Sequence, residues 1–553
     1  DGRAVIKNAL GWLALPKMMR AHIDEINSFA DEVKSGFSSV VLLGMGGSSL
    51  APLMFGEIFG KSGGYPRLIV LDSTDPDAIR AVEKMINLGK TLFIVSSKSG
   101  STIEPLSLFE YFYARLRQTA GDGAGKNFIA ITAPGSMLEG FSRKYGFMRL
   151  FLNPPDIGGR FSALSFFGLV PAACAGADIK KLLYHAGRME AAVNPPVPVL
   201  ENPGLKLGAA LAAFCMEGRD KLTFILPDAI SAFGLWLEQL IAESTGKEGR
   251  GIVPVAGETL GLKGSYGSDR VFAHIGVGGA DAQDALIDRK LDALAKAGHP
   301  VIRFHLSDLH ELGGEFLRWE IATAAAGSLM AINPFDQPDV ELAKKLARTR
   351  LEKKTKKGAP LNRMPGGAQF KGAGFDLYIG KGAFKRMKEG VITPALPSPV
   401  KGEERGKGAS PTAKGKPAPR LKPVWSLRAA LKKFFALPRD GDYFAVLAYC
   451  GAQDARLEKA FRGLQKAIRD LTGRAVQFGF GPRYLHSTGQ LHKGGADNGV
   501  FLIFTHDNKD AIPLPESRFS FGELIASQAV GDIDALESMG RRTALFNIKD
   551  MNK

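Results

Sequence analysis

Residues 38–44 read SSVVLLG, a short apolar run that ends in glycine. Similar runs follow at residues 67–72 (RLIVLD) and 91–97 (TLFIVSS), and the segments between the runs have helical patterns such as DPDAIRAVEKMI. Apolar strands that alternate with helices are typical of a parallel sheet that is covered on both faces. Together with a further run at residues 127–132, these segments predict a first α/β unit.

Residues beyond about Leu205 predict a second unit of the same kind. Its strands are expected at residues 221–226, 271–278 and 300–306, with helices at 229–245, 281–297 and 314–330. Later strands are expected at residues 442–450, 475–481 and 499–505, with a helix at 454–472. We interpret these later elements as a C-terminal α/β segment that completes the second unit, with a small third unit as the alternative.

A strongly basic segment separates the two groups of elements. Residues 345–424 contain 20 Lys and Arg and 5 Asp and Glu, so they carry +15 of the formal net charge of +16. The segment is rich in Gly, Pro and Ala, a composition that cannot bury enough apolar surface to offset the entropy lost on ordering. We therefore expect a solvated tether, and nucleic acid is not a predicted partner because no folded face carries the excess charge. The predicted domains are 1–200, 201–345, a basic tether at 346–424, and 425–553.

The three cysteines, Cys174, Cys215 and Cys450, lie far apart in the sequence. Because there is no CxxC or Cys/His cluster, neither a disulfide framework nor a metal site is predicted, and a cytoplasmic location is expected. The most apolar stretch, residues 163–177, is shorter than the roughly 20 residues of a membrane span and contains Pro171. No membrane association is therefore predicted.

Two loops after predicted strands have the composition of an anion-binding site. The first is GMGGSS (44–49) and the second is SKSGST (97–102). Backbone N–H groups at the start of a helix bind phosphate, hydroxyls add donors, and glycine allows close approach of the backbone. The alternative is that the hydroxyls only cap helices, although capping and phosphate binding are compatible. Neither loop has the spacing of a Walker or GxGxxG loop, which disfavours a nucleotide ligand.

Three further segments carry groups that are suited to acid–base chemistry. In SAFGLWLEQLIAESTGK (231–247), Gln239 and Glu243 are four residues apart and share one face of a predicted helix. The segment NPFDQPDVELAKK (333–345) contains a glutamine and two lysines, and YLHSTGQLHKGG (484–495) contains two histidines. Taken alone, the segment at 231–247 favours a solvated surface position for Glu243, and each of the other two could be structural, although two histidines beside Lys493 and glycines are a mild indication of function.

Five motifs together resemble the phosphoglucose isomerase family: LLGMGGSSLAP (42–52), SSKSGSTIEP (96–105), GGRFSALS (158–165), EQLIAESTGK (238–247) and NPFDQPDVELAKK (333–345). The resemblance implies two doubly wound α/β sandwich domains of the sugar-isomerase (SIS) type. It implies the interconversion of glucose 6-phosphate and fructose 6-phosphate, a step of glycolysis and gluconeogenesis. It also implies a sugar phosphate as the small-molecule partner, a homodimer, and neither a cofactor nor a metal.

The resemblance further implies roles for individual residues. The family's catalytic positions match Glu243 as the base, Arg160 as the group that stabilises a cis-enediolate, and Lys344 in ring opening. Its substrate-binding and phosphate-binding positions match Gly47, Ser48, Ser97, Lys98, Ser99, Thr102, Gln239 and Gln337, the last of these on the phosphate side.

The catalytic histidine departs from its usual place in the family, between the base and the FDQ motif. Residues 248–331 contain no histidine in a segment of the expected type, whereas HSTGQ occurs at 486–490. We therefore predict that His486, and not His492, takes part in ring opening. This arrangement resembles the isomerase half of proteins that fuse transaldolase to phosphoglucose isomerase.

Three alternatives stay open from the sequence. A regulator that binds a sugar phosphate without catalysis would not need Arg160, Gln239, Glu243 and Lys344 together. The isomerase part of a bifunctional transaldolase and isomerase would have the same activity in a different biological unit. An isomerase that also accepts mannose 6-phosphate would differ only in a few side chains of the pocket.

Overall fold

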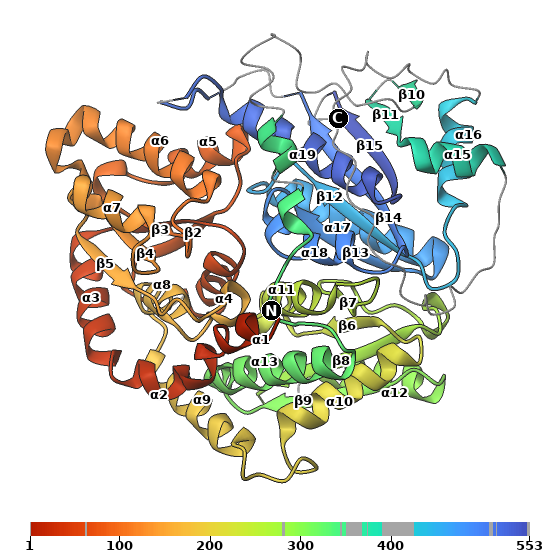
Figure 1. The fold of residues 1–553 in the computed structure, drawn as a ribbon, viewed down its shortest axis with the longest axis horizontal. Helices are drawn as coiled ribbons and strands as arrows, with labels where there is room; N and C mark the ends of the chain where they lie inside the picture. Colours follow the sequence, from red (N-terminus) through yellow and green to blue (C-terminus); the bar gives the residue numbers. More distant parts are fainter. Residues whose placement is uncertain are drawn as a thin grey trace.

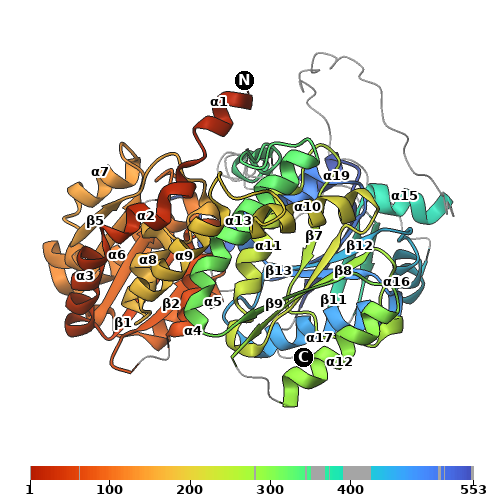
Figure 2. The same ribbon diagram turned by 90° about the horizontal axis from the view of Figure 1, so that it is seen from below.

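The computed structural model describes residues 2–60, 63–278, 282–342, 345–349, 368–372, 374–389, 425–507, 512–515 and 517–549. These residues build three α/β units, each around its own sheet. In Figure 1 the first unit lies on the left, the third at the upper right and the second below the third, and Figure 2 shows the same arrangement from below. Within the described part of the chain, no helix is long and apolar enough to cross a membrane.

The first unit contains a five-stranded parallel sheet with the order β2-β1-β3-β4-β5. Its strands are β1 (Ser39–Gly44), β2 (Arg67–Leu71), β3 (Thr91–Ser96), β4 (Phe128–Thr132) and β5 (Arg149–Leu152). Its helices are α1 (Gly2–Lys7), α2 (Leu15–Arg20), α3 (Ile23–Gly36), α4 (Leu50–Phe59), α5 (Pro76–Met85), α6 (Ile103–Ala120), α7 (Met137–Lys144), α8 (Phe166–Cys174) and α9 (Ile179–Val193).

Strand β1 is buried along its whole length because helices cover both faces of the sheet. Successive side chains of a strand point to opposite faces. Val40 and Leu42 pack in the core that includes residues of α3, α4 and α8, whereas Val41 and Leu43 pack in the core that includes residues of α5 and α6. The continuous apolar run at residues 38–44 therefore indicated a strand of this kind correctly.

The second unit has a four-stranded parallel sheet with the order β7-β6-β8-β9. Its strands are β6 (Lys221–Ile225), β7 (Val253–Val255), β8 (Arg270–Val277) and β9 (Val301–Leu306). Its helices are α10 (Pro203–Met216), α11 (Phe233–Thr245), α12 (Ala282–Lys296) and α13 (Leu312–Leu329). One hydrophobic core joins this unit to the first, since Trp236 of α11 and Phe316 of α13 belong to the same cluster as Val40.

The third unit has a six-stranded sheet with the order β10-β11-β15-β14-β12-β13. Its strands are β10 (Ala368–Lys371), β11 (Phe375–Ile379), β12 (Tyr443–Ala448), β13 (Ala475–Phe480), β14 (Gly499–His506) and β15 (Arg542–Ile548). Its helices are α15 (Lys381–Glu389), α16 (Leu427–Phe435), α17 (Ala455–Thr472), α18 (Gly489–Gly494) and α19 (Phe521–Ser538). Strands β12 to β15 are parallel, while β10 and β11 are antiparallel to their neighbours.

The third sheet corrects two expectations about the domains. Residues 425–553 were expected to complete the second unit, but their strands pair with one another and with β11, in a sheet separate from β6–β9. Residues 368–389 were expected to belong to the tether, yet they form β10, β11 and α15. β11 pairs with β15, a partner more than a hundred residues away that the basic composition of the segment cannot reveal. Residues 350–367, 373 and 390–424 of the predicted tether lie outside the described residues.

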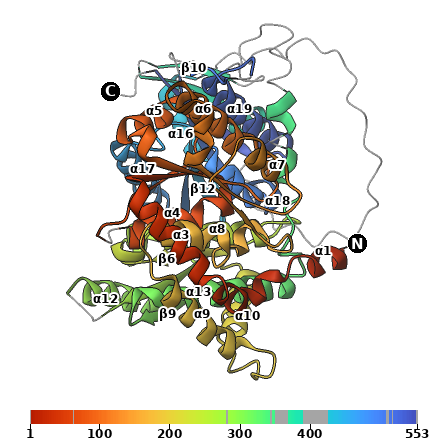
Figure 3. The ribbon, with the colours of Figure 1, turned by 90° about the vertical axis from the view of Figure 1, so that its left-hand side faces the viewer.

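Polar contacts hold the third unit against the first. Arg483 donates to both carboxylate oxygens of Asp72 at 2.6 and 2.8 Å, and Thr74 donates to Gln528 Oε1 at 2.8 Å. Asp72 and Thr74 follow β2 and are at most 1% exposed. In Figure 3, which is seen from the side of the first unit, α5 and α6 stand in front of α17 and α19. The carboxyl end of the first sheet therefore faces the third unit.

Candidate active site

The loop after β1 is closed against two other segments of the chain. Gly46 has a φ of +56°, and a Cβ there would lie 2.6 Å from the carbonyl oxygen of His486. A Cβ on Gly47 would lie 2.0 Å from the carbonyl oxygen of Gly159. Only glycine allows so close an approach of two backbones. The double glycine thus brings together three segments that the sequence keeps far apart.

The loop after β3 presents hydroxyl groups at the start of α6. Thr102 is the N-cap of α6, but its side chain caps no backbone N–H of the described residues. Its hydroxyl accepts from Ser97 Oγ at 3.1 Å and lies 3.4 Å from Ser99 Oγ. Ser97 Oγ in turn accepts from the N–H of Gly100 at 3.2 Å, and the hydroxyls of Ser99 and Ser101 are exposed. Because the first N–H groups of a helix have no partner within it, this loop forms a donor-rich cradle for an anion.

Lys98 adds a positive charge to the same loop. Burial lowers the pKa of its ammonium group, Asp156 opposes the shift, and Arg160 lowers the pKa further. The electrostatic coupling of Lys98 and Arg160 means that the two cations share one region. Together they favour an anionic ligand there.

Glu243 lies in the last turn of α11 with a partner on each carboxylate oxygen. Its Oε1 is 3.0 Å from Nη1 of Arg160, and its Oε2 accepts from Nε2 of Gln239 at 3.1 Å. The Glu243 side chain is 12% exposed, which leaves an edge of the carboxylate accessible. Gln239 reaches this carboxylate because residues four apart are neighbours on one helix face.

The guanidinium group of Arg160 is fixed in place by several acceptors. Its Nε donates to Ser244 Oγ at 2.8 Å, and its Nη2 donates to the carbonyl oxygens of Pro334 and Asp336 at 2.6 and 3.0 Å. Its Nη1 donates to Gln337 Oε1 at 3.1 Å. The side chain is only 3% exposed, so these bonds hold the cation in position before any ligand binds.

Asp336 contacts two buried cations, Arg160 through its carbonyl oxygen and Lys247 through its carboxylate. Burial lowers the pKa of Arg160, an effect that the carboxylates of Glu243 and Asp336 oppose. Nζ of Lys247 is 3.0 Å from Asp336 Oδ1 and also donates to the carbonyl oxygen of Asn333. Burial, followed by the nearby positive Arg160, lowers the pKa of Lys247 to about 8. Lys247 therefore holds the loop that carries the acceptors of Arg160.

His486 is joined to the base by a side-chain amide. Nε2 of Gln239, which donates to Glu243, also donates to the carbonyl oxygen of His486 at 2.8 Å. The imidazole Nε2 of His486 is 3.0 Å from Oε1 of Glu104 in the first turn of α6. The same carboxylate oxygen accepts from Gln528 at 2.7 Å. The histidine thus lies between the hydroxyl-rich loop and the base.

His492, the other histidine of this segment, is excluded from the site by its surroundings. Its side chain is buried, and its Nε2 lies 2.9 Å from Oε1 of Gln477 on β13. Burial lowers its pKa well below the ordinary range, and the positive Lys493 and Arg541 add to the effect. His492 therefore packs in the core of the third unit.

The structure gathers most of the predicted site residues into one region. Gln337 Oε1 accepts from Arg160 Nη1, and its place on the phosphate side stays a prediction. Lys344 lies outside the described residues. Ser48 is buried in the 3-10 turn after β1, where its carbonyl oxygen accepts from Ser96.

Sequence reasoning did not assign roles to Glu104 and Lys247. An acidic residue in the first turn of a helix is commonly explained by the helix dipole, so Glu104 gave no separate signal. Lys247 lies within the quoted motif at 238–247, but nothing in the sequence shows that it is buried at 3% exposure. Glu104 contacts His486 and Lys247 contacts Asp336, and both of these partners are distant in sequence.

The arrangement suits proton transfer next to a carbonyl group. A carboxylate with an accessible edge can accept a proton, and a fixed guanidinium at 3.0 Å can stabilise an oxyanion that forms beside it. The hydroxyl-rich loop can bind a phosphate at the other end of the same ligand. No redox group or metal is needed for such a step.

Comparisons with known proteins point to one family. The family model described as phosphoglucose isomerase matches residues 1–254. The glucose-6-phosphate isomerase of Rubrobacter xylanophilus is 30% identical over 399 residues, which cover 63% of this chain and 90% of that protein.

Solved structures agree with the fold. A hypothetical protein of Thermus thermophilus is 28% identical, with a TM-score of 0.57, over 63% of this chain and 93% of that one. A glucose-6-phosphate isomerase of Chlamydia trachomatis is 23% identical, with a TM-score of 0.53, over 62% and 75% of the two chains. The predicted α/β fold class is therefore confirmed, with the third sheet as an addition to it.

Proposed function

The chain belongs to the phosphoglucose isomerase family, and we propose that it interconverts glucose 6-phosphate and fructose 6-phosphate with Glu243 as the base. The observation that carries the proposal is the shared amide of Gln239, which bonds both Glu243 and the backbone of His486. A regulator that only binds sugar phosphates has no need of a carboxylate, a guanidinium and an imidazole held together in this way.

Ring opening is the first step, because the substrate is cyclic. We assign it to His486, whose Nδ1, the ring nitrogen that does not contact Glu104, gives a proton to the ring oxygen while the anomeric hydroxyl passes its own proton to Lys344. Glu104, at 3.0 Å from Nε2 of His486, orients the imidazole ring and stabilises its imidazolium form. Lys344 shares this step on the strength of the family resemblance alone.

Isomerisation follows on the open-chain aldose. Glu243 removes the proton from C2 to give a cis-enediolate, and it returns that proton to C1 while the hydroxyl proton moves from O2 to O1, which gives the ketose. Arg160 stabilises the negative oxygens of the intermediate, and it needs no rearrangement because its partners already fix it. Gln239 holds the carboxylate in the orientation that the transfer requires.

Phosphate binding fixes the far end of the substrate. Ser97, Ser99 and Thr102, with the first N–H groups of α6, supply neutral donors, and Lys98 supplies charge. Binding energy from this remote group places C1 and C2 near the base, which lowers the entropy cost of the chemical step.

Three finer proposals concern the biological unit. We infer that His486 serves the base of its own chain, since the amide link between them lies within one subunit. That a homodimer forms is a separate proposal, and it rests on the family resemblance alone. The likeness to the isomerase half of transaldolase fusion proteins is proposed from the position of HSTGQ at 486–490.

The proposed function is tested by a coupled assay of fructose 6-phosphate formation. Glucose 6-phosphate and mannose 6-phosphate are supplied as separate substrates to the purified chain. Turnover of glucose 6-phosphate is expected, and the ratio of the two rates measures stereospecificity at C2. A folded protein that binds 6-phosphogluconate but turns over neither substrate would identify a regulator instead.

A further inference from the structure

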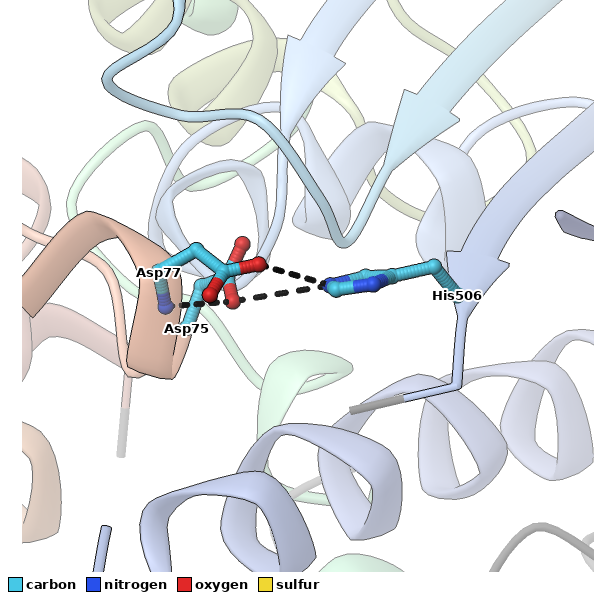
Figure 4. Close-up of side chains that lie close together, drawn as sticks. All are labelled: Asp75, Asp77 and His506. Atoms are coloured by element: carbon cyan, nitrogen blue, oxygen red, sulfur yellow. Dashed lines mark hydrogen bonds and ion pairs between the residues drawn. The ribbon is translucent and has the colours of Figure 1, made fainter. Parts of the chain in front are cut away.

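A second cluster of polar side chains lies where the first and third units meet. Asp75 is the N-cap of α5 and Asp77 is in its first turn, whereas His506 is the last residue of β14. The imidazole points toward the two carboxylates (Figure 4). Three atoms, one from each residue, lie within 4.8 Å of one another. The sequence predicted no metal site, because more than four hundred residues separate the histidine from the acids.

Nε2 of His506 is buried and forms no hydrogen bond with any described residue. The side chain is 9% exposed. Its Nε2 forms ion pairs with Asp75 Oδ1 at 3.6 Å and Asp77 Oδ2 at 3.8 Å, and both distances exceed those of a normal hydrogen bond. A buried nitrogen left without a hydrogen bond costs free energy, and a ligand between the three residues would remove that cost.

The spacing of these atoms fits a metal ion better than a hydrogen bond. With bonds of about 2.0–2.2 Å, the ligand atoms of a tetrahedral ion lie roughly 3.3–3.6 Å apart. The distances of 3.6 and 3.8 Å from Nε2 are close to this spacing. Imidazole nitrogen and carboxylate oxygen are both ordinary ligands of Zn²⁺.

Hydrogen bonds also orient both carboxylates, as in many metal sites. Asp75 Oδ2 accepts from the N–H of Gly451 at 3.3 Å, and Asp77 Oδ1 accepts from Arg80 at 3.2 Å. Oδ1 of Asp75, which also accepts from the N–H of Asp77 at 3.2 Å, and Oδ2 of Asp77 are the atoms that face His506.

We propose that Asp75, Asp77 and His506 bind a divalent metal ion such as Zn²⁺, with water as the fourth ligand, and that the ion joins α5 to β14. The role is structural. Asp75 follows Thr74, which bonds Gln528 and through it Glu104, the partner of His486. An ion at this position stabilises the contact between the units on which that chain of hydrogen bonds depends.

The test uses the full-length chain, freed of metal by dialysis against a chelator. ZnCl₂ is titrated calorimetrically into the wild type and three variants, and bound zinc is counted after desalting. The wild type is expected to bind one equivalent tightly, and zinc is expected to raise its Tm. His506→Gln should lose this equivalent, and Asp77→Asn should bind it at least about tenfold more weakly, as the loss of one ligand requires.

His310→Gln is the matched control, since His310 forms a pair with a single carboxylate, Asp308, at 2.6 Å. It should bind zinc as the wild type does. Asp77 is largely exposed, so Asp77→Asn is decisive even if His506→Gln fails to fold. A wild type that binds no zinc, or variants at Asp77 and His506 that bind it unchanged, would overturn the proposal and leave an ion pair between the two units.

Discussion

The first and third sheets share the arrangement of four parallel strands but use it differently. β2-β1-β3-β4 in the first sheet corresponds to β13-β12-β14-β15 in the third. In such sheets the loops after the two central strands diverge and leave a crevice for ligands. In the first sheet these loops are the glycine- and serine-rich segments at 44–49 and 97–102.

The same place in the third sheet is filled by protein. After β12 come Tyr449 and Cys450, each at most 2% exposed, and burial raises the pKa of both side chains. The N–H of Gly451 donates to Asp75 of the first unit, so the neighbouring unit occupies the position that a substrate would take. Topology therefore fixes where a site can form, and the loop residues decide whether a substrate or another part of the chain binds there.

Removal of the Arg160 guanidinium should have a large effect on catalysis at the candidate active site. Arg160→Gln is expected to lower kcat by about 10²–10³, the range for loss of a preorganised oxyanion-stabilising donor. Steady-state kinetics measures the change, with thermal unfolding to confirm the fold. Ser244→Ala, which removes one bond to Arg160, should cost much less. Equal losses in both variants would indicate general damage to the site.

Loss of the imidazole should separate ring opening from proton transfer. His486→Gln is expected to slow turnover of cyclic glucose 6-phosphate by about 10², in the range for a general acid–base group. An open-chain substrate such as an erythrose phosphate should be affected much less. His492→Gln is not a suitable control because that side chain is buried in the core. Equal loss on both kinds of substrate would contradict a role in ring opening.

The phosphate loop can be compared directly with its counterpart in the third sheet. Ser97→Ala and Thr102→Ala should each weaken binding of 6-phosphogluconate by roughly 1.5–3 kcal/mol, or about 10- to 100-fold in Kd. Calorimetry measures the change. Cys450→Ala, at the corresponding end of the third sheet, should leave Kd unchanged. An effect of Cys450→Ala as large as that of Ser97→Ala would contradict the proposal that the loop of the first sheet, and not that of the third, binds the phosphate.

The smallest expected effect is on the pH profile. Lys247 loses its proton as pH rises through about 8, and the ion pair with Asp336 is then lost. Because Asp336 also accepts from Arg160, kcat should decline on the alkaline side of pH 8. Arg stays protonated in this range, so Lys247→Arg should shift the decline to higher pH. An identical alkaline limb in both proteins would assign the decline to another group.

The sequence predicted long, buried strands well and short or edge strands poorly. β1 and β3 are continuous apolar runs with helices on both sides, and such a pattern is local. β7 has only three residues, and β5 is partly exposed, so neither strand has a distinct pattern of apolar residues in the sequence. β10 lies in a basic segment, and its place in the sheet depends on β11 and β15.

Prediction of the candidate active site from the sequence has the same limit, because local contacts follow from spacing and long-range contacts do not. Gln239 and Glu243 are one turn apart on a helix, so their contact follows from spacing. Glu104 and His486 are 382 residues apart, and no local pattern predicts that they pair. The contact of Gln337 with Arg160 was likewise not predictable, because it depends on how the loop that carries Gln337 folds around Arg160.

The most direct test of the account is the fate of the C2 proton in Glu243→Gln. The amide has nearly the same shape and cannot accept the proton, so the variant should fold and bind 6-phosphogluconate. Exchange of C2 hydrogen with D₂O, followed by NMR with glucose 6-phosphate, should slow by about 10²–10⁴ relative to the wild type. A folded variant that exchanges this proton at the rate of the wild type would contradict the assignment of Glu243 as the base.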